Sequence, residues 1–174
     1  MILVFALFMM AQHSQHVDAR HDTFGMSHEA THHNFRLFAD GGAIELRAND
    51  PADAATIGII RTHIRHIAAA LAKNDFSMPL FVHGHEPNGT ATMKRLHARI
   101  SYRYEDVDAG GRVRVTTTDP KALSAVHDFM KFQIKEHRTG DRGEVEMDRS
   151  GRKFRWPVAK MFTSRHILPG GIIV

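Results

Sequence analysis

An internal repeat constrains the fold of this chain more than any other feature of its sequence. Residues 41–51 read GGAIELRANDP and residues 110–120 read GGRVRVTTTDP, so the glycine pair, the alternating aliphatic residues and the Asp-Pro pair fall in register. A repeated unit cannot bury its apolar face alone and must pack against its neighbour. The repeat therefore predicts two units with the same order of elements, related by a pseudo-twofold axis.

Each unit is predicted to contain two strands followed by a helix. The strands that the alternation predicts are residues 35–38, 43–47, 99–104 and 112–117. The glycine pairs at 41–42 and 110–111 supply the positive φ that tight turns require, so we expect each pair to form a hairpin turn.

The Asp-Pro pairs mark the expected helix starts, because aspartate is a favourable N-cap and proline suits the first helical position. After Asp50-Pro51, aliphatic residues recur at spacings of three and four and form one apolar stripe. After Asp119-Pro120 a second helix is expected to run to about His137. The fold class is therefore α+β, with a four-stranded antiparallel sheet and both helices on one of its faces. The other face is expected to be a wet basic surface or a dimer interface, and its candidate residues are Arg47, Arg103, Arg112 and Arg114.

The composition predicts one domain with tails. The chain has 174 residues, of which 43% are apolar and 24% charged, enough for a buried core. The net charge of +4 is too small to indicate nucleic-acid binding by itself. The predicted divisions are a signal remnant at 1–11, an arm at 12–34, the repeat domain at 35–141 and a basic and apolar tail at 142–174. Within the tail, residues 149–155 are expected to be loose, and residues 167–174 could add an edge strand.

The first residues, MILVFALFMMA, suit the apolar region of an export signal. They are too few to span a bilayer, which needs about 20 apolar residues. We therefore expect a periplasmic or secreted protein whose signal starts further upstream, with no integral membrane span. An N-terminal strand or buried helix is the alternative interpretation.

Histidines crowd the segment just before the first repeat. Six of them, with Met26 in their midst, are His13, His16, His21, His28, His32 and His33. Neutral imidazole binds late first-row metals, and a thioether favours Cu(I). One helical turn would place His28 and His32 on the same face. The arm therefore predicts a site for copper, nickel or zinc, against the alternative of a solvated leader with incidental histidines.

A second pair of histidines lies in the long segment between the repeats, residues 74–95. His83 and His85 are two positions apart and would point the same way in an extended loop. They are candidates to assist the arm in metal binding, or to supply a general base to a small enzyme with a concave pocket. Ordinary loop residues are the simpler interpretation. His63 and His66, three apart on the first predicted helix, could form a bidentate metal pair, although histidines at a helix flank are more often hydrogen-bonded or solvated. His127 and His137 on the second predicted helix are expected to have packing roles.

Established catalytic motifs are missing from the sequence. It has no Gly-x-Ser-x-Gly elbow, no Walker loop and no Gly-x-Gly-x-x-Gly after a strand. It has no cysteine, which excludes thiol catalysis and zinc-thiolate sites. No residue is therefore assigned as catalytic.

The sequence resembles a largely uncharacterised family of small exported bacterial proteins. Residues 25–35 read GMSHEATHHNF and residues 40–45 read DGGAIE, similar to the family's Thr-Thr-His-His-Phe and Asp-Gly-Gly-x-Ile-Glu-Val motifs. Residues 64–68, 93–96 and 127–137 fit the family too, while Asn34 is an insertion before Phe35. Some members carry an aspartate carbamoyltransferase label, whereas transcarbamoylases are much longer and use a Ser-Thr-Arg-Thr loop. The resemblance implies export and the fold more than any reaction.

These observations lead to one main hypothesis and two alternatives. The main hypothesis is an exported protein that handles a transition metal, with copper favoured over zinc. Its predicted ligands are Met26, His28, His32, His33, His83 and His85. The alternatives are a small enzyme with a site in the His83 loop and an interaction module that dimerises through its sheet.

Overall fold

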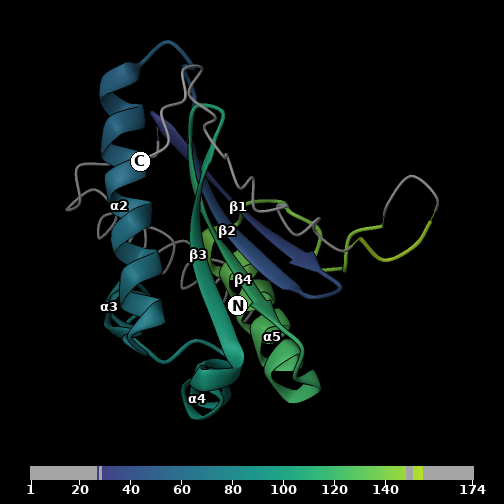
Figure 1. Cartoon of the computed structure of the whole chain (residues 1–174). Helices are drawn as coiled ribbons and strands as arrows, with labels where there is room; N and C mark the ends of the chain where they lie inside the picture. The colour runs from purple at the N-terminus through teal and green to yellow at the C-terminus, as the bar shows by residue number, and fades with distance from the viewer. Residues whose placement is uncertain (1–26, 28, 148–150, 155–174) are drawn as a thin grey trace, which may run out of the picture.

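Four antiparallel strands form the sheet at the centre of the fold in the computed structural model, which describes residues 27, 29–147 and 151–154 (Figure 1). The strands are β1 (Thr31–Phe38), β2 (Gly41–Ala48), β3 (Ile100–Val107) and β4 (Gly110–Thr117). Their order across the sheet is β1-β2-β4-β3. The two central strands therefore come one from each repeat, and the α+β fold class is confirmed.

The pairing of β2 with β4 shows the predicted symmetry. Ile44 and Val113, which are equivalent residues of the two repeats, lie directly opposite each other in the register. On either side the pairs mirror one another, with Gly41 opposite Thr116 and Arg47 opposite Gly110. The pseudo-twofold axis thus passes through the Ile44–Val113 pair.

The repeated glycines begin the returning strands and do not form the turns. The turn residues are Ala39–Asp40 and Asp108–Ala109, so the expectation that the glycine pairs make the hairpin turns is wrong. The glycines are needed because the central strands approach closely. A Cβ at Gly41 would lie 1.9 Å from the Val115 carbonyl oxygen, and one at Gly110 would lie 2.0 Å from the Leu46 carbonyl oxygen.

The two long helices begin differently. Helix α5 (Pro120–His137) starts where expected, and the Asp119 carboxylate accepts hydrogen bonds from the first turn. Helix α2 (Ala54–Ala72) starts three residues after the expected Pro51, because Asp53 provides the N-cap by accepting from Thr56 N–H. Asp50 instead accepts from the backbone N–H of Ala52 in the preceding turn.

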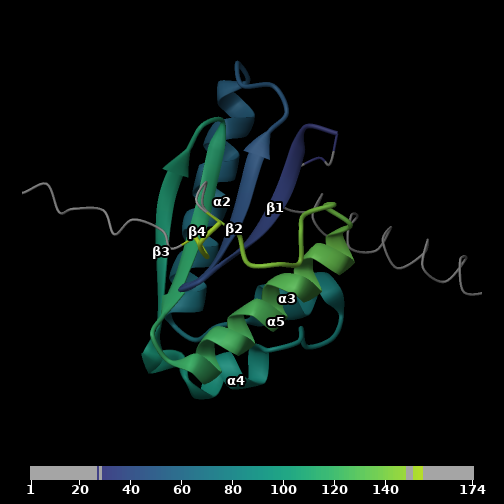
Figure 2. The ribbon, with the colours of Figure 1, turned by 90° about the vertical axis from the view of Figure 1, so that its right-hand side faces the viewer.

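Both helices cover the same face of the sheet, and each packs mainly on the strands of the other unit. Helix α2 lies over β3 and β4, whereas α5 lies over β1 and β2; Figure 2 shows α2 behind the sheet. Their inward residues join the sheet in one core, whose largest fully buried members include Leu37, Leu46, Ile60, Ile64, Phe129 and Met130. The two repeats are therefore interlocked.

The connection between the repeats is helical, contrary to the expectation of an irregular linker. It contains α3 (Ser77–His83), α4 (Thr90–Arg95) and the short 3-10 helix η1 (His97–Arg99). Gly84 ends α3 in the left-handed conformation, and its N–H donates to Leu80 O. Within residues 29–147 and the other described positions, no helix is long and apolar enough to cross a bilayer.

The chain after α5 returns along the outer edge of β1. Glu146 N–H donates to Leu37 O at 2.9 Å, and Ala39 N–H donates to Phe154 O at 3.0 Å. The Phe38 and Phe154 rings pack with centroids 5.6 Å apart. The expectation of a loose segment at 149–155 is therefore wrong for residues 151–154, whereas residues 149, 150, 155 and 167–174 lie outside the described part of the chain.

Candidate functional site

The adjacent histidines of β1 lie on opposite faces of the sheet. Residues 31–34 pair with β2, so the strand begins four residues earlier than expected and the arm cannot extend to residue 34. His32 is exposed on the far face, where its Nδ1 lies 2.7 Å from Asn49 Oδ1. His33 faces the helices. Met26 and His28 lie outside the described residues.

The histidines of the 83–85 pair are also separated. His83 is the last residue of α3 and is 4% exposed, while His85 follows the left-handed Gly84 and is exposed. His85 Nδ1 donates to the His83 carbonyl oxygen at 2.9 Å. The two imidazoles do not point the same way, because the segment is a helix end and not an extended loop.

A small apolar pocket between the helices and the sheet gathers four histidines from four different elements. His33 comes from β1, His63 from α2, His83 from α3 and His137 from the last turn of α5. The cavity has a volume of about 60 Å³. Met78 and Gln133 also line it, and every other lining residue is aliphatic, aromatic or proline. We call this group of residues the histidine pocket.

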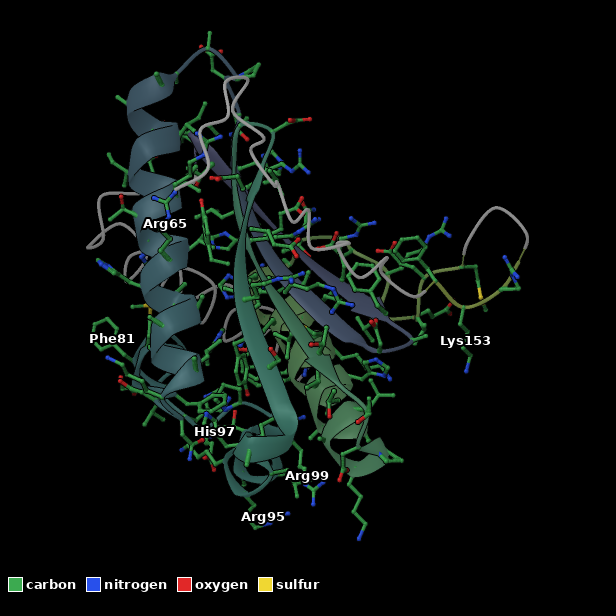
Figure 3. All side chains as sticks on the ribbon, in the orientation of Figure 1. Arg65, Phe81, Arg95, His97, Arg99 and Lys153 are labelled. Carbon is green, nitrogen blue, oxygen red and sulfur yellow. The ribbon has the colours of Figure 1, made fainter. Side chains whose placement is uncertain are left out.

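Helix α3 forms one wall of the histidine pocket. Met78, Val82 and His83 face the cavity, whereas Phe81 is exposed and points outward beside α3 (Figure 3). The outward side of the short helix is apolar as well, since Leu80 and Phe81 are both exposed. Its inward face contributes a thioether and an imidazole to the same cavity.

His137 stands between two of the other imidazoles. Its ring centroid is 5.1 Å from that of His33 and 5.1 Å from that of His83. Phe35 packs on His137 with centroids 5.2 Å apart, and the edge of Phe132 contacts His83 at 5.0 Å. Aromatic neighbours thus hold these imidazoles in place.

A buried hydrogen bond joins Gln133 and His83. The Nε2 atom of His83 lies 2.9 Å from Gln133 Oε1, and both residues are 4% exposed. An amide oxygen only accepts hydrogen bonds, so Nε2 must carry the proton. In the neutral ring the lone pair is then on Nδ1.

Burial lowers the pKa of His63 to about 4, and the nearby His66 contributes to the shift. The charged form loses hydration in the apolar surroundings of the pocket, so the neutral form is favoured. At neutral pH His63 therefore presents an uncharged imidazole, the form that binds metals.

The pKa of His63 predicts how stability depends on pH. Its folded pKa of about 4 is below the ordinary 6.5, so the unfolded chain binds more protons between these values. The free energy of unfolding is therefore highest above pH 6.5, and it falls by roughly 2 to 3 kcal/mol as the pH is lowered to 4. Urea unfolding of metal-free protein at pH 7 and pH 4.5 should show a smaller difference in His63→Gln than in the wild type. Equal differences would contradict this assignment.

The ligand types of the histidine pocket restrict the metal it could hold. In the described part of the chain, no three histidine, aspartate or glutamate side chains form a group that could hold a metal ion. The pocket does add the Met78 thioether to its imidazoles. Imidazole with thioether is a soft ligand set, which suits Cu(I) better than zinc or harder ions.

The far face of the sheet carries a larger, charged groove. It has a volume of about 870 Å³ and lies between β1, β2 and the returning segment 140–147. Two of its arginines are paired, since Arg36 Nε lies 2.5 Å from Glu146 Oε1 and Arg47 Nε lies 2.6 Å from Glu45 Oε1. The other candidate arginines of this face are paired as well, Arg103 and Arg112 with Glu105 and Arg114 with Asp40. The expectation of a basic face is therefore corrected, while a dimer through this face stays a prediction.

Sequence reasoning missed four members of the histidine pocket: His63, Met78, Gln133 and His137. A signal for two of them was available. Phe129, Gln133 and His137 recur at a spacing of four on α5, so two polar residues continue a buried apolar stripe. Their place on the buried stripe was the available signal that these two polar side chains line a cavity inside the fold.

Comparisons with protein-family models, with curated proteins and with solved structures each find no match to this chain. The resemblance to a family of exported proteins therefore stays a prediction.

Proposed function

We propose that this protein binds copper, as Cu(I), in the histidine pocket. One observation carries the proposal: four imidazoles from four different elements and the thioether of Met78 line one small cavity whose walls contain no charged side chain among the described residues. Soft nitrogen and sulfur ligands in an apolar enclosure favour Cu(I), whereas magnesium and calcium require several oxygen ligands.

The spacing of the rings supports a shared ion. Metal–nitrogen bonds of about 2 Å place the centroids of two imidazoles on one ion roughly 5 Å apart. His33 and His83 are each 5.1 Å from His137 by the same measure. His137 paired with either neighbour, together with Met78, would provide three donors.

This proposal changes the ligand set expected from the sequence. His33 and His83 are retained, His137, His63 and Met78 are added, and His32 and His85 are placed outside the pocket. Met26 and His28 remain candidate donors outside the described residues. A periplasmic or secreted location is part of the proposal and rests on the apolar first residues of the chain.

Three matched pairs of histidines test the proposal. In each pair one member lines the pocket and a near neighbour does not: His33 with His32, His83 with His85, and His63 with His66. Cu(I) affinity is measured by competition with a chromophoric chelator under anaerobic conditions. We expect His33→Ala and His83→Ala to weaken binding at least about 10-fold, because even supporting residues around a metal contribute about 10- to 100-fold.

The outward variants provide the control. His32→Ala, His85→Ala and His66→Ala should bind Cu(I) within about twofold of the wild type, because they leave every pocket residue in place. Equal losses of Cu(I) affinity in His32→Ala and His33→Ala would indicate that the histidine-rich arm, and not the histidine pocket, binds the metal. Binding of Cu(I) no tighter than about micromolar would rule out a copper function.

A small enzyme is the second candidate, because a concave pocket does surround His83. Its buried imidazole would then serve as a general base for a ligand in the cavity. The pocket volume of about 60 Å³ leaves room for only a few atoms. A thermal-shift screen with small heteroaromatic compounds tests whether the pocket holds a ligand, and a rise in Tm that His83→Ala abolishes would support this function.

A further inference from the structure

We infer that Gln133 is a positioning residue that holds His83 in the tautomer able to bind the metal through Nδ1. This inference rests on the proposed copper site. It concerns a residue of α5 that was not among the ligands expected from the sequence.

The contact between Gln133 and His83 is fully enclosed. The two side chains are 4% exposed each, and Gln133 Oε1 lies 2.9 Å from His83 Nε2. Water therefore does not compete for this hydrogen bond. With Nε2–H donating to the amide oxygen, the lone pair of the neutral ring is on Nδ1, and Nδ1 is the nitrogen that a metal would have to use.

The surroundings of His83 limit other orientations of its ring. Phe132 contacts it edge-on with centroids 5.0 Å apart, at an interplanar angle of 81°. His137 contacts it at 5.1 Å and 86°. A ring packed against two near-perpendicular neighbours cannot rotate without displacing them. The packing therefore fixes the orientation of the ring, and the hydrogen bond to Gln133 sets its tautomer.

The identity of residue 133 is not explained by packing alone. Its neighbours one turn away on α5 are the buried Phe129 and the pocket residue His137, and an aliphatic side chain would fill the same space. Burying an amide costs free energy unless it forms a hydrogen bond. Supporting hydrogen bonds of this kind are a regular feature of histidine ligands, and their loss typically weakens metal binding about 10- to 100-fold.

The test measures the tautomer of His83 and the affinity for Cu(I) separately. Long-range ¹H–¹⁵N correlation spectra of the metal-free protein at pH 8 report which nitrogen of His83 carries the proton, with His83→Ala providing the assignment. We expect the Nε2–H tautomer in the wild type and in Gln133→Glu, which keeps an acceptor. In Gln133→Met, which removes the acceptor, we expect a mixture of tautomers.

Cu(I) competition on the same proteins completes the experiment. Gln133→Met should bind Cu(I) about 10- to 100-fold more weakly, and Gln133→Glu should recover most of the affinity. An Nδ1–H tautomer in the wild type, or an unchanged tautomer in Gln133→Met, would overturn the inference whatever the metal affinity. If the wild type shows Nε2–H but binds no Cu(I), the copper function fails while the role of Gln133 toward His83 stands.

Discussion

Gly41→Ala and Gly110→Ala are each expected to lower the free energy of unfolding by about 3 to 5 kcal/mol, which places them among the most damaging single substitutions. The added Cβ would lie 1.9 Å from Val115 O in the first variant and 2.0 Å from Leu46 O in the second. Both contacts are with backbone, so no side-chain rotation can relieve them. Gly41 also has a φ of +147°, which side chains rarely adopt.

Urea unfolding followed by circular dichroism measures both effects. The two contacts are related by the pseudo-twofold axis, but only Gly41 has a positive φ, so the loss in Gly41→Ala should be at least as large as that in Gly110→Ala. Gly58→Ala is the matched control: this glycine lies on the exposed side of α2, and an added Cβ would meet nothing within 4 Å. It should stabilise the protein by about 0.5 to 1 kcal/mol, because alanine is a better helix former. Wild-type stability in Gly110→Ala would show that β2 and β4 are not in this register.

The architecture was predictable because the repeat is a long-range signal contained in the sequence itself. Equivalent residues had to occupy equivalent places, although the symmetry alone did not determine that Ile44 and Val113 would be the pair on the axis. Local signals were less decisive. Asp50-Pro51 and Asp119-Pro120 look alike, but a second good N-cap, Asp53, lies nearby and starts α2 instead. The choice between two adequate caps depends on how the helix packs, which no local pattern contains.

The site was less predictable, because its members meet only through tertiary packing. Histidines that are neighbours in sequence, such as His32 and His33, are separated by the alternation of a strand. Histidines far apart in sequence, such as His33 and His137, come within 5.1 Å because α5 lies over β1. The density of histidines along the chain indicated a metal site in the N-terminal arm, whereas the fold brings together one histidine from each of four elements.

Arg114→Met is expected to cost about 3 to 5 kcal/mol, the range found when one partner of a buried ion pair is removed. Arg114 is 2% exposed, and its Nη2 donates to Asp40 Oδ1 at 2.6 Å while Nη1 donates to Gly42 O at 2.9 Å. The guanidinium also lies over the Phe38 ring, 4.7 Å from its centroid. Burial lowers the pKa of Arg114, and the Asp40 carboxylate opposes that shift.

Arg103 provides the control, because it lies directly opposite Arg114 on the neighbouring strand and on the same face of the sheet. Its side chain is 54% exposed and pairs with Glu105, so Arg103→Met should cost less than about 1 kcal/mol. Arg114→Lys should recover little of the lost stability, because an ammonium cannot reproduce the planar guanidinium that donates to Asp40 and Gly42 at the same time. Adding Asp40→Asn to Arg114→Met should recover part of it by removing the carboxylate left without its arginine. Equal losses in Arg103→Met and Arg114→Met, measured by urea unfolding at pH 7, would contradict the buried position of Arg114.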